Sequence, residues 1–483
     1  MQPLFPGLET VEDMIFWRHY NEHLSTVLTV EGEHRNAFKD IMVPIAVRHQ
    51  GLMHSILSLA SKHLDFDTPY GINLLKNNPT TSREALRERS IYHHEQARQK
   101  FYEDIESTNG KPSIDDKTLI SARYGQMLCF LLEALAEGSP RGEHRLHLNA
   151  YRSLISTSPP EDPAFLSFIS EFFQYHIYAD ELIHTALAGD NNWPPKRPPP
   201  VLDIHPPRLL GVADGMLECL SEITAIRNSI RANMLAEEDP VVDYEKLYRA
   251  TQIDAKIREW VSDWPSGDNR NRVTAIYQQM LWIYLVRTVY PPSSSPPPSL
   301  PSSTTSSAMR YGSPSHSRPT SSVVNTPPQS ASTSCASSPR LAASNPMHDD
   351  KEPTPARTYS QHPGGRTADS PPPTRHPVHH DPRITQAVDE ALSLLEEFKP
   401  SDPCQTLLLL PCFLIGTAAF STTQQRRIRG VIRNVRGYTG LRNADRVMEV
   451  LEEIWRLMEM GQWAAVWDWP GVARRLGLDF IPA

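Results

Sequence analysis

A 92-residue segment rich in proline and serine divides the chain and constrains its fold more than any other feature. It runs from Pro291 to Pro382 and holds 20 of the 44 prolines, with no tryptophan and no phenylalanine. A segment of this composition cannot bury enough apolar surface to offset the entropy lost on ordering. The sequence therefore predicts a disordered insertion over 291–382.

Both sides of this segment carry the pattern of helices. Apolar residues recur at three- and four-residue spacing in the two clearest stretches: Tyr124, Met127, Leu128, Leu131, Leu132 and Leu135, and Val447, Val450, Leu451, Ile454, Trp455 and Met458. That repeat matches the 3.6 residues of one helical turn. The same reasoning predicts helices over 12–27, 82–105, 144–155, 165–187, 208–234, 244–262 and 273–288. A capping box from Thr81 to Glu84 is expected to start the helix at 82.

The organisation of the chain follows from these two observations. A length of 483 residues allows up to three domains. After the insertion, apolar residues again recur at helical spacing, and nothing marks the beginning of a new domain. A long insertion is also compatible with one domain, because the entropy of closing a loop grows only logarithmically with its length. We therefore expect one helical domain made of 1–290 and 383–483, with 291–382 looped out of it. The expected fold class is all-α, a large bundle or array of about twelve or more helices.

Charge and apolar content exclude some classes of partner. The formal net charge is −8. The chain as a whole therefore lacks the excess of basic residues that would attract it to nucleic acid or to an anionic membrane. No segment reaches the roughly 18 consecutive apolar residues expected of a membrane span, and the N-terminus has no signal-peptide pattern. The sequence predicts an intracellular protein without a membrane partner, in which any affinity for DNA is local.

The cysteines fit neither a disulfide framework nor a metal site. There are five, and they are far apart in the sequence: Cys129, Cys219, Cys335, Cys404 and Cys412. The C-x7-C spacing of the last pair matches neither a zinc knuckle nor a redox CxxC motif. We expect reduced thiols, as in the cytosol or the nucleus.

Histidines gather in several stretches, and none of these stretches is interpreted as a metal or catalytic site. His93 and His94 open a zincin-like pattern that lacks the second histidine four residues on, and His94 is expected to be a hydrogen-bonded core residue. His144 and His147 have no recognisable third ligand. The tract at 375–382, "RHPVHHDP", is expected to be solvated.

The stretch at 43–65 is predicted to form two short helices. Pro44 suits the first turn of one helix, and Gly51 marks the break or the start of the next. An apolar stripe in the second helix is expected to dock on the bundle: Met53, Ile56, Leu57, Ala60 and Leu64. The three histidines of this stretch are spaced five and nine residues apart, which does not gather them on one face as ligands.

Motifs of catalysis are missing from the sequence. There is no GxSxG elbow, no GxxxxGK[ST] phosphate loop and no GxGxxG after a strand. No acid, base or nucleophile stands at a workable spacing. We therefore predict no enzymatic activity, no catalytic residue, no bound metal and no cofactor in this chain.

One basic stretch forms a candidate phosphate-contacting patch. Between Arg426 and Arg446 lie seven arginines and one acid, Asp445. The candidate contact residues are Arg426, Arg427, Arg429, Arg433 and Arg436. A patch of this kind can bind DNA phosphates. The favoured interpretation is a solvated helix face that neutralises the acidic helix after it, because no aromatic residues are interleaved for stacking.

The insertion carries six Ser/Thr-Pro pairs that a proline-directed kinase can phosphorylate. The candidate acceptors are Ser295, Ser313, Thr326, Ser338, Thr354 and Ser370. Each phosphate adds up to about two negative charges. Composition alone also produces such pairs in a Ser/Pro-rich tract, so both interpretations stay open.

An ordered set of segments resembles one known family. The segments are those at 35–64, 92–105, 127–155, 171–182, 409–432, 443–461 and 467–480. They include "VPIAVRHQGLMHSILSLASKHL", the Leu-Glu-x-x-Trp helix in "VLEEIWRLMEMG" and the final "WDWPGVARRLGLDF". Their order is similar to that of the fungal-specific transcription factor domain, which often follows a zinc binuclear cluster. The resemblance covers nearly the whole chain outside the insertion.

This resemblance implies an all-helical regulatory domain in the nucleus, with the cytoplasm as a second location, rather than an enzyme. Its implied partners are the transcription machinery or other transcription factors, with a homodimer as a further option and DNA contacted only indirectly. The zinc cluster of the family needs six cysteines in two C-x2-C-x6-C halves, whereas the first cysteine here is Cys129. Zinc is therefore expected only if an upstream cluster is missing from the sequence.

Two function classes follow from this interpretation. The leading one is a transcription regulator that acts through partners or through the missing zinc cluster. The alternative is a sensor module in which the helical core binds a sterol-like molecule or another metabolite, with "LLLLPCFLIGTAAF" as an apolar wall.

Overall fold

The computed structural model describes residues 5–30, 36–107, 116–184, 216–262, 264–292 and 381–483. Residues 1–294 and 377–483 form one compact unit. All elements below belong to this unit, and the predicted insertion at 291–382 lies almost wholly outside the described residues.

Helices account for the regular structure of the described residues. Before the insertion they are α1 Val11–His19, α2 Ser25–Val27, α3 Val43–Ala46, α4 Gln50–His63, α5 Pro69–Asn77, α6 Arg83–Ser107, α7 Asp116–Glu137, α8 His144–Thr157, α9 Pro163–Ile183, α10 Met216–Leu235, α11 Tyr244–Glu259 and α12 Asn269–Val289. After it they are α13 Pro382–Glu396, α14 Leu409–Gly416, α15 Thr422–Thr439, α16 Asn443–Glu459, α17 Trp463–Trp467 and α18 Trp469–Arg475. Within the described ranges no strand forms, and the predicted all-α class is confirmed.

Short segments of other helix types interrupt the series. Tyr20–Leu24 and Phe38–Met42 are π-helical, and Pro403–Leu407 is a 3-10 helix. The helix predicted over 12–27 therefore consists of α1, a π-helical segment and α2. Tyr20, at the start of the wider π-helical turn, is buried in the core. Its hydroxyl donates to the Phe38 carbonyl at 2.9 Å.

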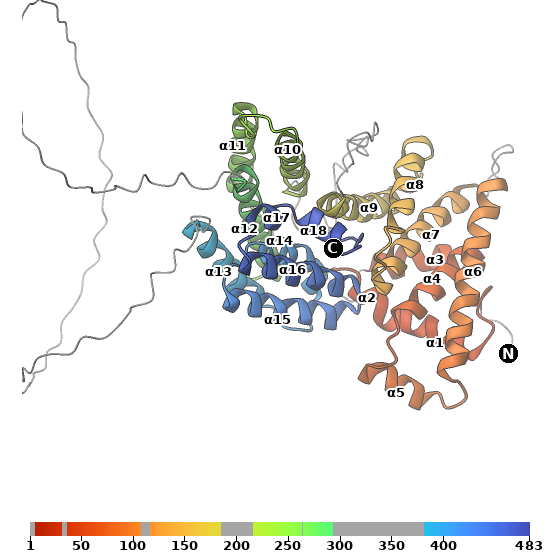
Figure 1. The fold of residues 1–483 in the computed structure, drawn as a ribbon. Helices are drawn as coiled ribbons and strands as arrows, with labels where there is room; N and C mark the ends of the chain where they lie inside the picture. The colour runs from red at the N-terminus through yellow and green to blue at the C-terminus, as the bar shows by residue number, and fades with distance from the viewer. Residues whose placement is uncertain (1–4, 31–35, 108–115, 185–215, 263, 293–380) are drawn as a thin grey trace, which may run out of the picture. The chain divides into compact units, whose positions relative to one another are not determined.

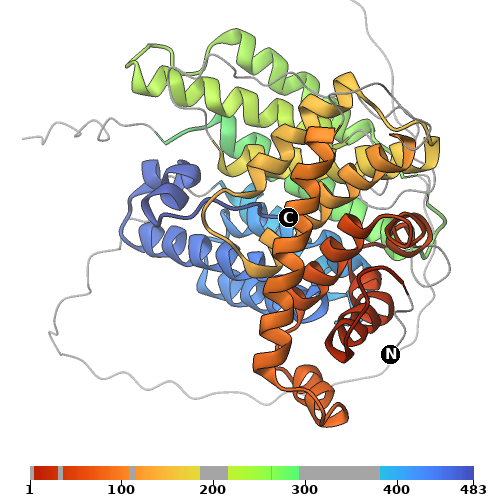
Figure 2. The same cartoon turned by 90° about the vertical axis from the view of Figure 1, so that its right-hand side faces the viewer.

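Helices before and after the insertion pack into the same unit (Figure 1). α12 packs against α13 and α14, and α18 packs against α9. Thr406 Oγ1 donates to the Val27 carbonyl at 2.8 Å, which joins residues 379 positions apart. Figure 2 shows the chain end in the middle of the unit, where Ile481 is buried.

Helix ends follow local capping chemistry. Thr10 and Asp13 form a capping box at α1, and Ser421 and Gln424 form one at α15. The predicted capping box at Thr81 is wrong, because α6 begins at Arg83 and Ser82 Oγ accepts the N–H of Ala85 at 3.1 Å. The cap therefore lies one residue later in the chain.

The stretch at 43–65 folds as two helices, as predicted. Pro44 lies in the first turn of α3, and Gly51 lies in the first turn of α4. The predicted stripe of α4 is buried, and most of its other residues are buried as well. α4 packs between α6 and α7, so it is a central helix rather than one docked by a single face.

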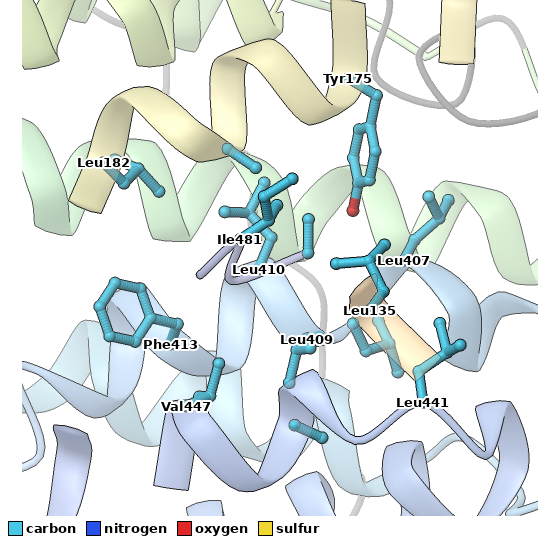
Figure 3. Close-up of a cluster of buried hydrophobic side chains, with 14 of the residues drawn as sticks. Leu135, Tyr175, Leu182, Leu407, Leu409, Leu410, Phe413, Leu441, Val447 and Ile481 are labelled. Atoms are coloured by element: carbon cyan, nitrogen blue, oxygen red, sulfur yellow. The ribbon is translucent and has the colours of Figure 1, made fainter. Parts of the chain in front are cut away.

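Figure 3 shows a cluster of core side chains where helices from both parts of the chain meet. Its labelled side chains come from α7, α9, α14, α16, the segments next to α14 and α16, and the chain end: Leu135, Tyr175, Leu182, Leu407, Leu409, Leu410, Phe413, Leu441, Val447 and Ile481. Every residue of α14 is buried. The segment expected as an apolar wall is therefore a core helix.

Among the described residues, one helix is long and apolar enough to cross a membrane. It is the segment Lys117–Glu137 within α7, and 78% of its most apolar stretch is buried inside the protein. Buried core helices can have the same length and composition. The contacts of α7 with α4 and α8 account for its apolar character.

Candidate functional site

Two arginines of the predicted patch on α15 are held by acids of neighbouring helices. Arg427 Nε donates to Glu396 Oε1 at 2.8 Å, and Nη2 donates to Oε2 at 2.9 Å. Arg429 forms a similar pair with Glu452 at 2.5 and 2.7 Å, and its Cζ lies 4.6 Å from the ring centre of Trp455. Paired guanidinium groups of this geometry have few donors left for phosphates.

The other arginines of the patch differ in their surroundings. Arg436 Nε lies 3.4 Å from Asp445 Oδ2, and Nη2 lies 3.9 Å from Asp65 Oδ2. Arg426 and Arg433 are exposed, and neither forms an ion pair with a described residue. Two arginines without acidic partners, two helical turns apart, give only a small positive surface for contact with phosphates. Phosphate contact by this patch stays a prediction.

The candidate phosphorylation sites lie outside the described residues, and so do Cys335 and most of the tract at 375–382. The other four cysteines are free and buried: Cys129, Cys219, Cys404 and Cys412. Burial raises the pKa of the Cys219 thiol to about 11 and raises those of the other three as well. Such thiols are poor nucleophiles at neutral pH.

The described residues include no group of three or more His, Cys, Asp or Glu placed to hold a metal ion. Several buried histidines instead take part in hydrogen-bonded networks that join helices. Buried polar side chains need such partners, because an unpaired polar group away from water is costly.

The first network centres on Asp13, which is fully buried. Arg89 Nε donates to Asp13 Oδ1 at 2.6 Å, and His93 Nε2 donates to the same oxygen at 2.8 Å. His93 Nδ1 lies 2.8 Å from His54 Nδ1. Burial tends to raise the pKa of Asp13, but the hydrogen bonds from Arg89 and His93 outweigh it and hold this pKa well below its usual range.

This network corrects one prediction. His93, rather than His94, is the core histidine of α6, because the buried stripe runs through Leu86, Ser90, His93 and Ala97. His94 is partly exposed, and its Nδ1 lies 2.8 Å from Glu133 Oε2. Spacings of four, three and four residues match the helical pitch and place these four residues on one face of α6.

The second network joins α1, α4, α5 and α15. His63 Nε2 donates to the Thr439 carbonyl at 2.8 Å, so His63 Nδ1 must accept. It accepts from His19 Nε2 at 2.9 Å, and His19 Nδ1 accepts from the Tyr70 hydroxyl at 2.9 Å. Burial lowers the pKa of His63 to about 4 and lowers that of His19 well below its usual value. Both rings are neutral at pH 7.

The third network ties the chain end to α8 and α9. His144 Nε2 donates to Asp180 Oδ1 at 2.8 Å, and Arg145 Nε lies 3.1 Å from the same oxygen. Arg145 also forms a two-fold ion pair with Asp479. The Gly142 N–H donates to the Asp479 carbonyl at 2.9 Å. These contacts fix the last residues of the chain against the domain.

Two buried arginines, Arg227 and Arg287, form a polar cluster that sequence analysis missed. Arg227 Nη2 donates to the Trp467 carbonyl at 2.5 Å, and its Cζ lies 3.6 Å from the ring centre of Trp469. Burial lowers the pKa of Arg227. Arg227 Nε and Trp469 Nε1 are buried and have no hydrogen-bond partner among the described residues.

The second buried arginine, Arg287, caps the end of another helix. Its Nη1 donates to the Thr417 carbonyl at 2.5 Å and to Thr417 Oγ1 at 2.6 Å. Burial, with a smaller effect of Arg227, lowers the pKa of Arg287 to about 9. The carbonyls of Thr417 and Trp467 both lie at helix C-terminal ends, where the negative end of the helix dipole favours a cation. The cluster therefore stabilises the packing of α14 and α17 through carbonyl acceptors.

Two adjoining surface pockets lie between α11, α12 and α13. Their volumes are about 810 and 530 Å³, and both are lined by Gln279, Gln386 and Glu390. Gln386 Nε2 donates to Glu390 Oε1 at 2.9 Å. The lining offers amides, carboxylates and Trp282, and it includes no nucleophile with an activating base.

A model of the fungal specific transcription factor domain matches residues 15–313 and 362–483. The chain belongs to this family. Comparison with curated proteins and with solved structures found no match. The family is one of transcription factor regulatory domains and not a family of enzymes, which gives the chain a general role in transcription regulation.

The segments that resemble the fungal specific transcription factor domain serve packing in this chain. Trp455 of the Leu-Glu-x-x-Trp helix donates from Nε1 to the Gly416 carbonyl at 2.9 Å. Trp469 of the final Asp-Trp segment stacks on Arg227. His54 and His63 of the first segment join the networks above. These four residues therefore contribute to packing and hydrogen bonding between helices.

Proposed function

We propose that this domain regulates transcription in the nucleus through protein partners, or through a zinc cluster that this sequence does not contain. Direct reading of bases by α15 is not part of the proposal. The observation that carries the regulatory role is the match to the fungal specific transcription factor domain. The pairing of Arg427, Arg429 and Arg436 with acids of the same unit argues against base reading by α15. Two exposed arginines do not form a groove-reading element.

Binding of the purified chain to short DNA duplexes tests this proposal. We expect weak binding that is the same for unrelated sequences and disappears as salt rises, because only phosphates are contacted. The double variant Arg426→Gln/Arg433→Gln should reduce even this binding. Sequence-specific binding by the chain alone, retained at physiological salt, would overturn the proposal.

A second candidate function is small-molecule sensing. Its support is the polar cluster in the core, where Arg227 Nε and Trp469 Nε1 are buried donors without an acceptor in the described part of the chain. Unpaired buried donors are costly and favour a ligand that supplies acceptors. Melting curves with a panel of anionic metabolites and sterols test this function. A shift with one ligand that is lost in Arg227→Lys supports it, and no shift across the panel rejects it.

A further inference from the structure

Helices α10 and α11 form a hairpin whose closed end carries large exposed apolar side chains. The two helices lie side by side and are joined by residues 236–243 (Figures 1 and 2). Leu235, at the end of α10, is 78% exposed, and Tyr244, at the start of α11, is 91% exposed. Tyr248 is 68% exposed. Exposure of this extent is unusual for aromatic residues, which are enriched in protein interfaces.

Three exposed apolar side chains lie on one face of α11. Tyr244, Leu247 and Tyr248 have the i, i+3, i+4 spacing that places residues together on a helix surface. The buried face of the same helix holds Ala250, Ile253 and Ile257 and packs against α10 and α12. The exposed stripe is therefore separate from the stripe that α11 needs for its own packing.

The same end of the hairpin is acidic. Within residues 235–249 there are five acids and two bases, a net charge of −3. Asp243 caps α11 and pairs with Lys246. The other four acids form no ion pair with a described residue: Glu237, Glu238, Asp239 and Glu245. Unpaired carboxylates around exposed aromatic rings give the surface an electrostatic preference for a basic partner.

Contacts within the hairpin hold this end in place. Asn233 Nδ2 donates to the Val241 carbonyl at 3.0 Å, and the side chain of Asp243 accepts the N–H of Lys246 at 2.9 Å. Val241 and Val242 are partly buried against the core. A preformed surface loses less entropy on binding than a flexible one does.

We propose that the hairpin tip, defined as Leu235, Glu237, Glu238, Asp239, Tyr244, Glu245, Leu247 and Tyr248, docks a protein partner. That partner presents an apolar face flanked by lysine or arginine side chains. The aromatic residues pack on the apolar face, and the carboxylates pair with the flanking basic residues. This inference rests on the proposed function, because it names the surface through which the regulator contacts a partner.

Two synthetic peptides test whether the hairpin tip binds an apolar surface and prefers basic residues around it. Both are 20-residue amphipathic helices with the same leucine face, and their flanking positions carry lysine and arginine in one and glutamate in the other. Fluorescence anisotropy with the full chain should give at least ten-fold tighter binding of the basic peptide, weakening with salt. Equal binding of the two peptides would overturn the proposal.

Variants of the chain locate the binding. Tyr244→Ala/Tyr248→Ala and Glu237→Gln/Glu238→Gln/Asp239→Asn should each weaken binding of the basic peptide at least ten-fold. The matched controls are Leu146→Ala on α8, a leucine that is 71% exposed, and Glu88→Gln/Glu95→Gln on α6. Controls that lose binding, or tip variants that keep it, would reject the tip as the site.

Two further experiments distinguish docking of a partner from self-association, and this inference from the proposed function. If sedimentation shows that the chain self-associates and that Tyr244→Ala/Tyr248→Ala abolishes this, the occupant is a second copy and the proposal is wrong. Fused to a foreign DNA-binding domain, the wild type should alter a reporter gene and the tip variants should lose that effect. Full activity of the tip variants rejects the inference alone, whereas an inactive wild type counts against the proposed function.

Discussion

His63 Nε2 lies 2.8 Å from the carbonyl oxygen of Thr439, which joins α4 to the C-terminal end of α15 across 376 residues. The next residue, Gly440, has a φ of +69° and ends α15 in the left-handed conformation. The His63 ring covers the position that a Cβ atom on Gly440 would occupy. One glycine thus allows both the end of a helix and a contact between the two halves of the fold.

Gly440→Ala should therefore destabilise the domain for two reasons. The left-handed backbone costs about 1–2 kcal/mol for a residue with a Cβ atom, and the new atom overlaps His63. Gly461→Ala is the matched control, because Gly461 also has a φ of +69° and nothing lies within 4 Å of the position that its new Cβ atom would take. Urea unfolding should give a larger loss for Gly440→Ala, and equal losses would contradict the contact.

Asp13→Asn should cost about 3 kcal/mol or more of unfolding free energy. The change leaves Arg89 and His93 without the buried carboxylate that both contact. Asp67→Asn is the control, because Asp67 is 85% exposed in its ion pair with Arg83, and such pairs contribute about 0–1 kcal/mol. Similar losses for the two variants in urea unfolding would show that burial of Asp13 has no special role.

Three buried histidines and the partly buried His147 should make the domain less stable as the pH falls from about 7 to 4. Burial lowers the pKa of His54, His63, His147 and His176 to about 4. Between their usual pKa and this value the unfolded chain binds protons that the folded chain does not, so unfolding is favoured. Each group contributes at most about 3 kcal/mol.

His147→Phe tests this pH dependence at one position. His147 stacks on Phe130 with ring centres 5.2 Å apart, and a phenylalanine keeps a ring there without a titratable group. Melting temperatures measured from pH 7 to pH 4.5 should fall less steeply in this variant than in the wild type. An unchanged slope would show that His147 titrates normally in the folded protein.

Arg227→Lys should destabilise the domain by about 1–3 kcal/mol although the charge is kept. Lysine cannot stack its head group on Trp469 and donate to the Trp467 carbonyl in the same geometry. Arg258→Lys is the control, because Arg258 is exposed and pairs only with Asp254 among the described residues. Chemical denaturation compares the two, and a loss below about 0.5 kcal/mol for Arg227→Lys would contradict the role assigned to the stacked guanidinium.

Strong periodicity predicted the helices that have one apolar face. α16 is an example, since Val447, Val450, Leu451 and Ile454 are all fully buried as the spacing indicated. α5 was not predicted, because its nine residues span too few turns for a repeat to stand out, although Thr68 before Pro69 was a usable signal for a cap followed by the first turn. The π-helical segment Tyr20–Leu24, which separates α1 from α2, has no recognisable sequence pattern.

The buried polar clusters were harder to predict than the helices. Arg227 lies among Ile223, Ile226 and Ile230, and an arginine in an apolar stripe is a signal for burial. Its partner Trp467, and the partner Thr417 of Arg287, come from segments more than a hundred residues away. Sequence spacing cannot place such groups together. The histidines at 43–65 show the same limit, because the partners of His54 and His63 come from distant helices.

The most direct test of a role in transcription regulation is a tethered reporter assay. The full chain is fused to a foreign DNA-binding domain in a fungal cell, and its reporter output is compared with that of the DNA-binding domain alone at equal nuclear abundance. We predict a change in transcription, activation or repression, that persists in Arg426→Gln/Arg433→Gln. No change in output from the folded fusion protein would contradict the account.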